Sequence, residues 1–385
     1  DYWRLTLATD YRLLATTMKI TGLKWYPYKL PFAGAFGTAQ AALKVREGFI
    51  LRLGTAEGLV GLGDAAPLPE FGGGYPADVE RWLVNLAPGL PGKSPEVVNS
   101  LVTHLLEKGG PGAAATAFAL ETAAFDVLSQ AAGLPLSDWL ASNFDLLSQE
   151  TSKSVPVNAT IGQPDNEVAA QAARQAVEAG FSCVKLKVGL AKSVAGEVER
   201  VGKVRQAIGP GVKLRLDANG GWSVTQAIET LNALEQFDLE LVEQPVTAID
   251  VDGLAQVRRT VKMPIAADEP VTSLNTACRI IEAKAADFLV IKPMVVGGLR
   301  AGLEISKLAR AAGVGAIVTT TIDSAVGIAA ALHLAANLPA PVPYCGLATA
   351  PLLTGPLVEM APAVVEGQML VPSKPGLGID LNFPL

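Results

Sequence analysis

The sequence predicts an α/β protein: a modified (β/α)7β barrel with an α+β capping domain that is formed by the N-terminal lobe and the C-terminal tail. From residue 154 onward, short apolar strands alternate with amphipathic helices, which is typical of parallel βαβ units. Before residue 150, strand-like segments come first and helices follow, which is typical of an α+β lobe. After residue 350 the chain is rich in proline and glycine and loses both patterns.

These changes of pattern divide the 385 residues into three expected segments. Residues 18–150 are the expected capping domain, and they follow an extension, residues 1–17, to which we assign no role. Residues 151–350 are the expected catalytic barrel. Residues 351–385 form a tail that we expect to return to the capping domain. The length suits a barrel with a second lobe.

The capping lobe begins with alternating sequences that predict antiparallel strands, followed by helical sequences. The expected strands are residues 19–27, 44–53 and 59–64, and the expected helices are residues 77–86, 95–107 and 113–132, with one more between 135 and 152. Residues 31–40 are rich in Gly, Ala and Phe and predict a flexible apolar loop. Such a loop can fold over a substrate and bring Phe32 and Phe36 to the site; the alternative is a plain surface connection.

The barrel is predicted by eight strand-like segments and seven helices, with the last helix missing or displaced. Strands are expected at residues 155–161, 184–188, 213–217, 239–243, 265–268, 288–292, 316–321 and, weakly, 344–347. Helices are expected at residues 166–179, 194–208, 224–236, 251–261, 274–283, 299–312 and 324–337. The alternative is a doubly wound open sheet, but no G-x-G-x-x-G opens a helix after any of these strands.

The expected helix ends carry suitable capping residues. Ser223, Ser273 and Ser324 stand where N-caps belong, and glycines stand where helices should end, at Gly180, Gly209 and Gly313.

Composition excludes several classes of function. A net charge of −6, a pI near 5.2 and the lack of any Lys/Arg run argue against a nucleic-acid binder. No long uncharged apolar stretch predicts a membrane span, and residues 1–17 do not resemble a secretory signal. Three widely spaced cysteines indicate neither a disulfide framework nor a zinc site, so we expect a cytoplasmic protein. With only two histidines, His104 and His333, any general base is expected to be a lysine or a carboxylate.

The chemistry centres on residues 183–189, which read C-V-K-L-K-V-G. Side chains on a strand alternate between its two faces, so Lys185 and Lys187 should point together toward the barrel interior. Two buried ammonium groups need anionic partners. The next three strands each end in a carboxylate and the fourth in a lysine: Asp217, Glu243, Asp268 and Lys292. Counted from Lys187, the intervals are 24 to 30 residues. Such spacing is typical of one strand-plus-helix unit, so these residues should meet at one end of the barrel.

Three carboxylates in a small volume need a cation, and with oxygen ligands alone Mg2+ is the natural choice, with Mn2+ as the alternative. Lys187 and Lys292 would leave a gap over the metal, where a small-molecule substrate could place its carboxylate. A metal-bound carboxylate acidifies the neighbouring carbon, because the cation holds the charge of the enediolate. Like-charge repulsion from Lys185 would prepare Lys187 as the base. The arrangement therefore suits proton abstraction alpha to a carboxylate.

The sequences K-L-K, D-A-N, E-Q-P, A-D-E and I-K-P, in this order, resemble the muconate lactonizing subgroup of the enolase superfamily, whose members use a lysine base with Mg2+. The resemblance covers most of the chain after residue 18. It implies that Asp217, Glu243 and Asp268 bind the metal, that Lys187 is the acid and base, and that Lys292 lies on the opposite face of the substrate. It implies supporting roles for Lys185, Asn219 and Glu269.

Two further segments resemble the o-succinylbenzoate synthase family: G-L-G-D-A-A-P-L-P-E-F-G at residues 61–72 and C-G-L-A-T-A at residues 345–350. The chain departs from that family's pattern at Asp64, where Glu is usual, and at Asp323, where Glu is expected at the pocket rim. The resemblance implies dehydration of 2-succinyl-6-hydroxy-2,4-cyclohexadiene-1-carboxylate to o-succinylbenzoate, a step of menaquinone or phylloquinone synthesis. Lys187 would then transfer both protons, while Lys292 would stay cationic.

Alternatives remain open within the subgroup and outside it. In a dipeptide epimerase, Lys187 and Lys292 would act as bases from opposite faces, but that family usually has a D-x-D pair near the seventh strand, where this chain has Thr321 and Asp323. N-succinylamino-acid racemisation could coexist with the synthase activity. Outside these activities stand a catalytically silent barrel that binds or scaffolds, and a phosphate-binding barrel suggested by Gly297-Gly298. Homo-oligomers are compatible with the sequence.

Overall fold

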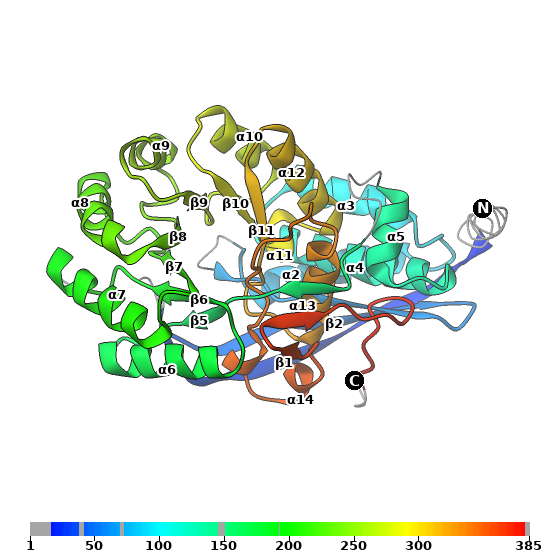
Figure 1. Ribbon diagram of the computed structural model, residues 1–385. Coiled ribbons are helices and arrows are strands. Elements are labelled where there is room, and N and C mark those ends of the chain that lie inside the picture. Colours follow the sequence, from blue (N-terminus) through cyan, green and yellow to red (C-terminus); the bar gives the residue numbers. More distant parts are fainter. Residues whose placement is uncertain (1–16, 38–41, 70–72, 145–150, 192, 382–385) are drawn as a thin grey trace.

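The computed structural model describes residues 17–37, 42–69, 73–144, 151–191 and 193–381. They form a seven-stranded sheet and two three-stranded sheets. In Figure 1 the seven-stranded sheet and its outer helices lie on the left, and the capping lobe lies behind and to the right. The expected extension, apart from Thr17, lies outside the described residues, and the segment boundaries at 150 and 350 stay predictions. No helix in the described ranges has the length and apolarity needed to cross a membrane.

The capping sheet is antiparallel, in the order β1 (Ile20–Gly37), β2 (Ala42–Thr55) and β3 (Val60–Ala65). Our prediction of a loop was wrong for residues 31–37, which continue β1. The pairing with β2 is interrupted after Pro31 and resumes at Phe36, opposite Leu43. Pro31 has no N–H to donate, which accounts for an irregularity there. Residues 38–41 and the side chain of Phe36 lie outside the described part of the chain.

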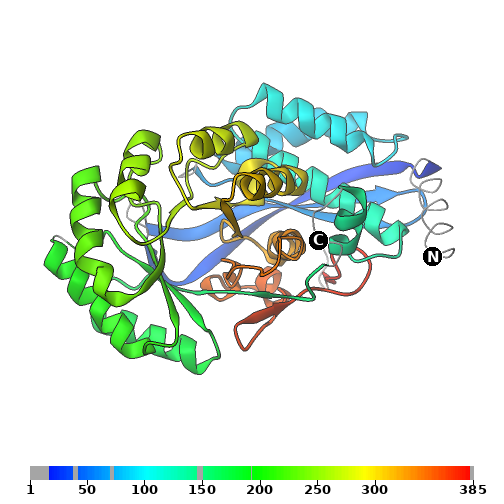
Figure 2. The same cartoon turned by 45° about the horizontal axis from the view of Figure 1, so that its top comes forward.

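Four helices follow the capping sheet: α2 (Pro76–Leu86), α3 (Val97–Lys108), α4 (Ala113–Ala131) and α5 (Leu136–Asn143). Helix α4 is buried along almost its whole length and packs directly on β3. Gly61 and Gly63 allow this approach, because a Cβ atom there would lie 1.9 Å and 2.0 Å from the carbonyl oxygens of Ala123 and Ala119. Figure 2 shows the capping helices lying over the long blue strands.

The barrel wall consists of seven parallel strands in chain order. They are β5 (Ala159–Ile161), β6 (Cys183–Lys187), β7 (Lys213–Asp217), β8 (Leu239–Glu243), β9 (Ile265–Ala267), β10 (Phe288–Ile291) and β11 (Gly315–Val318). Inside the barrel, Leu241, Ala266, Val290 and Ile317 form a small apolar cluster of their own, with Phe288 packed against it.

The barrel closes differently from the prediction at its first and last strands. The segment expected as the eighth strand forms only isolated bridges: Cys345 pairs with Val157 and Gly346 with Thr319. These two parallel bridges join both edges of the seven-stranded sheet and so complete the barrel. The first expected strand is divided, because β4 (Ser154–Pro156) pairs with the tail and not with the barrel.

The outer helices are α6 (Asn166–Glu178), α7 (Val194–Ile208), α8 (Val224–Leu234), α9 (Val251–Thr260), α10 (Leu274–Glu282), α12 (Leu299–Ala311) and α13 (Ala325–Ala335), with the short α11 (Pro293–Val296) after β10. The predicted N-caps are confirmed, since the side chains of Ser223, Ser273 and Ser324 each accept a backbone N–H of the first turn. Helix α13 is entirely buried.

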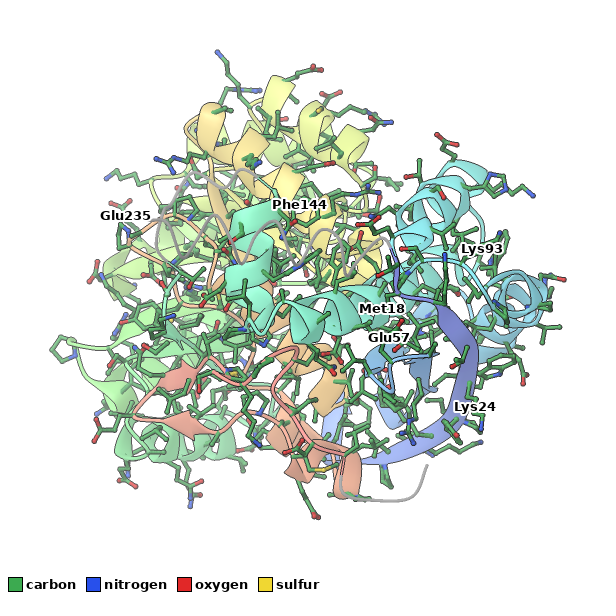
Figure 3. The ribbon with its side chains drawn as sticks, turned by 90° about the vertical axis from the view of Figure 1, so that its right-hand side faces the viewer. Met18, Lys24, Glu57, Lys93, Phe144 and Glu235 are labelled. Atoms are coloured by element: carbon green, nitrogen blue, oxygen red, sulfur yellow. The ribbon has the colours of Figure 1, made fainter. Side chains whose placement is uncertain are left out.

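The tail contacts both lobes. Its short elements are α14 (Pro356–Glu359), β12 (Val364–Val365) and β13 (Gln368–Leu370), and β13 pairs with β4. Beyond the hairpin, the N–H of Leu136 donates to the carbonyl of Gly376 (2.8 Å), which attaches the tail to α5. In Figure 3, which faces the capping lobe, Lys24 on β1 and Glu235 after α8 lie at opposite edges of the molecule.

Candidate active site

The barrel strands bring the predicted charged residues to one end of the molecule. Lys187 pairs with Asp217 across β6 and β7, and Asp217 pairs with Glu243 across β7 and β8. Asp268 and Lys292 directly follow β9 and β10. Because the carboxyl ends of parallel strands meet at one rim of a barrel, all five side chains converge there.

The lysines and carboxylates at this rim are in direct contact. Lys187 Nζ lies 2.6 Å from Asp217 Oδ2 and also 2.6 Å from Asn219 Oδ1. Lys185 Nζ donates to Glu243 Oε1 (3.0 Å) and lies 3.2 Å from Asp217 Oδ2. On the other side Lys292 Nζ donates to Asp268 Oδ1. Each of these charges, of which Lys187 is only partly buried, therefore has an opposite charge beside it.

Burial and neighbouring charges shift the titration of the carboxylates in opposite directions. Burial, together with the negative charge of Asp217, raises the pKa of Glu243 to about 7. Burial also raises the pKa of Asp268, and the nearby Lys292 offsets only part of this effect. Burial acts on Asp217 in the same direction, but Lys187 and Lys185 outweigh it and hold the pKa of Asp217 below its usual range. Of the three carboxylates, Glu243 and Asp268 therefore have raised pKa values.

The donor set fits a hard divalent cation, although the described residues contain no three metal-binding side chains already gathered around one point. The lysine ammonium groups explain this arrangement, because Lys185 lies between the carboxylates of Glu243 and Asp217. Three buried carboxylates that supply only oxygen ligands suit Mg2+. Binding of the ion would require the lysines to give up these contacts.

The charged residues line a cavity of about 80 Å3 at the end of the barrel, which we name the barrel-mouth cavity. Its charged and amide members are Lys185, Lys187, Asp217, Asn219, Glu243, Asp268 and Lys292. The remaining wall is made of hydroxyl and apolar groups: Leu68, Thr160, Thr319, Thr320, Thr321, Ile322, Gly346, Thr349 and Leu352. Of these nine residues, sequence reasoning named only Thr321, at the position where dipeptide epimerases usually have a D-x-D pair. The two motif segments did contain Leu68, Gly346 and Thr349, so the motifs mark the cavity wall.

A larger cavity of about 960 Å3, the interlobe cavity, lies between α3 and α4 on one side and α11 and α12 on the other. Leu68 and Thr321 line both cavities, so the two adjoin at these residues.

The other predicted site residues lie behind the cavity wall or apart from it. Glu269 accepts a hydrogen bond from Asn219 Nδ2 (3.0 Å) and so supports the residue that holds Lys187. Asp323 is buried against Thr321, with its Oδ1 accepting from the Thr321 hydroxyl at 2.6 Å, and does not line the barrel-mouth cavity. The backbone of Phe32 pairs with Leu353, and its side chain packs on the main core. The side chain of Phe36 lies outside the described residues.

Gly297 and Gly298, which suggested phosphate binding, precede a helix N-terminus that contacts a carboxylate of the protein itself. The N–H of Arg300, in the first turn of α12, donates to Glu121 Oε2 at 3.1 Å. Gly298 is required there, because a Cβ atom at this position would lie 2.3 Å from the same oxygen. A carboxylate from α4 thus occupies the helix N-terminus that a phosphate would need.

Comparison with known families agrees with this geometry. A family model described as mandelate racemase / muconate lactonizing enzyme, N-terminal domain, matches residues 16–141, and one described as enolase C-terminal domain-like matches residues 167–384. The L-Ala-D/L-Glu epimerase of Bacillus subtilis (strain 168) is 34% identical over 369 residues, which cover 94% of this chain and 97% of the epimerase. An o-succinylbenzoate synthase of Thermobifida fusca (strain YX) is 43% identical over 202 residues, which cover 52% of this chain and 61% of the synthase.

Solved structures give the same result. A substrate-liganded L-Ala-D/L-Glu epimerase from Bacillus subtilis has a TM-score of 0.86 with 29% identity, covering 94% of this chain and 98% of that one. An N-succinyl Arg/Lys racemase from Bacillus cereus has a TM-score of 0.85 with 25% identity, covering 94% and 96%. The predicted fold class and family are both confirmed. The chain belongs to the enolase superfamily, in its mandelate racemase and muconate lactonizing enzyme group.

Proposed function

We propose that this chain is a Mg2+-dependent o-succinylbenzoate synthase, which dehydrates 2-succinyl-6-hydroxy-2,4-cyclohexadiene-1-carboxylate. Membership of the superfamily supports the half-reaction, which is proton abstraction alpha to a carboxylate. The 43% identity with the Thermobifida fusca synthase over half of the chain supports the substrate.

One observation carries this choice of substrate. Apart from Asp217, Glu243 and Asp268, no described residue that lines the barrel-mouth cavity is acidic. A dipeptide brings an ammonium group that needs a carboxylate partner once it leaves water. Asp323, the nearest candidate after β11, is turned toward Thr321 and Arg46. A wall of hydroxyl and apolar groups suits a carbocyclic dicarboxylate that carries no cation.

Asp217, Glu243 and Asp268 would hold Mg2+, with Mn2+ as a substitute. When bound, the ion supplies positive charge to the substrate carboxylate and so acidifies the carbon beside it.

Lys187 performs both proton transfers. As a neutral amine it removes the proton from the ring carbon that bears the carboxylate, and as the resulting ammonium it gives that proton to the departing hydroxyl group. The C–O bond breaks, water leaves and the ring becomes aromatic, so protons and charge balance. Asn219 Oδ1, which lies 2.6 Å from Lys187 Nζ, orients the amine, and Glu269 orients Asn219.

Lys292 remains a cation on the other face of the ring. Its charge stabilises the negative charge that spreads over the ring during proton removal. It needs no change of protonation in this reaction.

Dipeptide epimerisation is the second candidate, with N-succinylamino-acid racemisation as an accompanying activity. The match to the Bacillus subtilis epimerase extends over 94% of this chain, which favours this candidate. In either reaction Lys187 and Lys292 would exchange protons from opposite faces.

The test is to incubate the purified protein with Mg2+ and the cyclohexadiene carboxylate and to follow formation of the aromatic product. We expect turnover that chelation abolishes and that Asp217→Asn removes. A parallel set contains L-Ala-L-Glu and N-succinylamino acids in deuterated water. The proposal is wrong if the intact protein forms no aromatic product but exchanges the alpha hydrogen of the dipeptide.

A further inference from the structure

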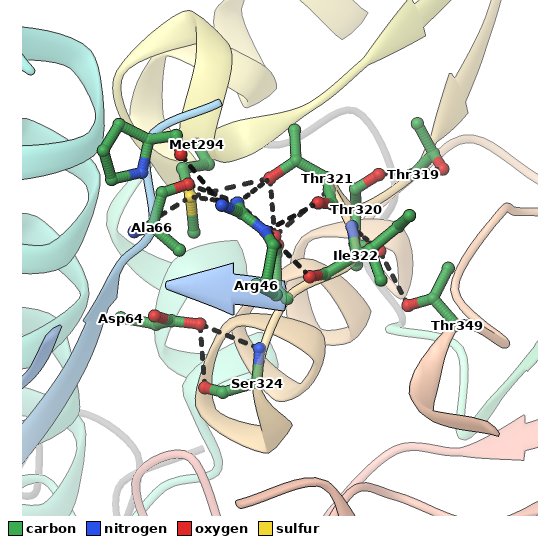
Figure 4. Close-up of polar contacts among 12 residues, drawn as sticks. Arg46, Asp64, Ala66, Met294, Thr319, Thr320, Thr321, Ile322, Ser324 and Thr349 are labelled. Carbon is green, nitrogen blue, oxygen red and sulfur yellow. Dashed lines mark hydrogen bonds and ion pairs between the residues drawn. The ribbon is translucent and has the colours of Figure 1, made fainter. Parts of the chain in front are cut away.

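Arg46, on β2 of the capping lobe, is a buried cation with only 2% of its surface exposed. Its Nη1 donates to the carbonyl of Pro67 at 2.8 Å, and its Nη2 donates to the carbonyl of Ala66. Its Nε donates to the carbonyls of Thr321 (3.2 Å) and Ile322 (3.1 Å). Figure 4 shows the guanidinium between these two segments. One side chain therefore joins the end of the capping sheet to the segment that follows β11.

Both segments form walls of the barrel-mouth cavity. Leu68, directly after Pro67, lines one side, and residues 319–322 line another. Arg46 is not among the described residues that line this cavity, so its guanidinium lies behind the wall.

Ile322 has a backbone φ of 62°, in the left-handed region. A β-branched side chain is disfavoured there because its Cβ atom crowds the backbone, and such a conformation persists only where the surroundings impose it. The carbonyl of Ile322 accepts from Arg46, and its N–H donates to Thr320 Oγ1 at 3.3 Å. These contacts hold the strained residue at the wall of the cavity.

Two carboxylates also accept hydrogen bonds from this part of the chain. Asp323 Oδ1 accepts from the N–H of Thr321 at 3.2 Å and lies 3.8 Å from Arg46 Nη2. Asp64 Oδ2, from β3, accepts from the N–H (3.0 Å) and the hydroxyl (2.7 Å) of Ser324 at the start of α13. Burial raises the pKa of both carboxylates, and the positive charge of Arg46 offsets part of this effect.

We propose that Arg46 is a positioning residue for the substrate: its guanidinium fixes residues 66–68 against residues 319–322 and holds Ile322 in its left-handed conformation, so that the Ile322 side chain forms the apolar wall for the substrate ring. This inference rests on the proposed function only for the identity of the ring. This part of the wall lies where the capping lobe meets the barrel, because Arg46 comes from one and Ile322 from the other.

The test compares Arg46→Met and Arg46→Lys with a matched control, Arg205→Met. Arg205, on α7, also donates to backbone carbonyls, those of Phe237, Gly209, Val212 and Asp238, but outside the site. We expect Arg46→Met to speed amide hydrogen exchange in residues 319–324 at least tenfold. KM should rise 10- to 100-fold while kcat changes less than threefold, because a wall contact acts on ground and transition states alike. Arg46→Lys should be intermediate, and Arg205→Met should change neither exchange in this segment nor KM.

A double-mutant cycle separates positioning from general destabilisation. Ile322→Gly removes the side chain and accepts a left-handed backbone without strain. If Arg46 acts through Ile322, Arg46→Met should raise KM less than twofold in the Ile322→Gly background. Partial unfolding would instead lower kcat at unchanged KM. Equal effects of Arg46→Met in both backgrounds, or an unchanged KM in the folded Arg46→Met protein, would overturn the proposal.

Failure of the proposed function is recognised separately. If the parent protein acts on a dipeptide or an N-succinylamino acid instead, the same cycle is measured with that substrate. The exchange measurement needs no turnover, and Arg46→Lys replaces Arg46→Met should the latter not fold. If amide hydrogen exchange in residues 319–324 were the same in the Arg46 variant as in the parent protein, the inference would be contradicted whatever the substrate.

Discussion

Lys187 and Lys292, which both line the barrel-mouth cavity, have different tasks in the proposed reaction, and substitution by arginine distinguishes these tasks. Arginine keeps the charge but cannot act as a base in a protein. Lys187→Arg should lower kcat for dehydration by about 10² to 10⁴-fold, the usual contribution of a general base. Lys292→Arg should lower it clearly less, because Lys292 needs only its charge. Rates of aromatic product formation measure both effects. Equal loss in the two variants would indicate that Lys292 also transfers protons, as in epimerisation.

If the carboxylates bind Mg2+, the ion should stabilise the folded protein. Mg2+ at about 100 times its Kd should stabilise the folded parent protein by about 2.7 kcal/mol relative to chelated protein. Asp217→Asn should abolish this gain, because the variant loses a charged ligand. Asp287→Asn is the control, since Asp287 pairs with Arg258 (2.7 Å) away from the barrel-mouth cavity and should leave the gain intact. Thermal unfolding with and without Mg2+ measures this stabilisation. If Mg2+ stabilised Asp217→Asn as much as the parent protein, the metal assignment would be contradicted.

At this scale the sequence predicted the charged residues but not the wall that faces them. The period of two along β6 places Lys185 and Lys187 on one face, and regular spacing aligns the carboxylates. Arg46 gave no local signal, because its partners lie 20 and 275 residues away along the chain. Asp323 accepts from Thr321, two residues earlier, and also lies 3.8 Å from Arg46 Nη2, so part of its environment comes from a residue that is distant in sequence.

Among the elements, helix α4 packs closely on β3 in the capping lobe. Gly63→Ala should destabilise the protein by about 3 kcal/mol or more, because the new methyl group meets backbone atoms of Ala119 that cannot move aside. Gly22→Ala in the same sheet is the control, since a Cβ atom there meets nothing within 4 Å. Urea unfolding of both variants measures the difference. Equal stabilities would show that α4 can shift away from the sheet.

His333 on α13 joins α5 and the tail and should make the protein sensitive to acid. Its Nδ1 accepts from the N–H of Ser137 at 3.1 Å, and its Nε2 lies 3.1 Å from the carbonyl of Leu377. Since a carbonyl only accepts, Nε2 carries the proton and the ring is neutral. Burial lowers the pKa of His333 to about 4. The histidine of the unfolded chain has the ordinary pKa of about 6.5, so it becomes protonated at a higher pH than the buried histidine of the folded protein. The folded protein therefore loses stability as the pH falls from about 6.5 toward about 4.

The expected loss between pH 7 and pH 5 is about 2 kcal/mol, at about 1.4 kcal/mol per pH unit below the ordinary value. Burial raises the pKa of Glu121 to about 7 and that of Asp126 to about 6, which changes stability in the opposite direction. These groups act alike in parent and variant, so the difference between the parent and His333→Gln isolates the histidine. Urea unfolding at the two pH values should show the parent losing about 2 kcal/mol more. Identical pH dependence in the two proteins would contradict the assignment.

The helices were easier to predict than the ends of the sheets. The helix caps at Ser223, Ser273 and Ser324 are local signals that the structure confirms. The division of residues 155–161 could not be read locally, because β4 turns away to pair with β13, more than 200 residues later. Likewise, the barrel closes at Cys345 and Gly346 through two bridges, too few to give a strand pattern.

For the whole molecule, repetition made the fold predictable. Successive strand and helix units leave few alternatives to a barrel once the Rossmann glycine pattern is missing. The relation between the lobes depends on contacts distant in sequence, such as Arg46 with Thr321 and Glu121 with Arg300. Such contacts leave no local signal in the sequence, whereas the charged residues at the strand ends do, so the half-reaction could be predicted more firmly than the substrate.

A crystal structure of the protein with Mn2+ and o-succinylbenzoate tests the central claim most directly, because anomalous scattering locates the ion without assumptions. We expect one ion held by Asp217, Glu243 and Asp268, with the aromatic ring between Lys187 and Lys292 and against Ile322. An ion elsewhere, or the product in the interlobe cavity while both lysines stay on their carboxylates, would contradict it.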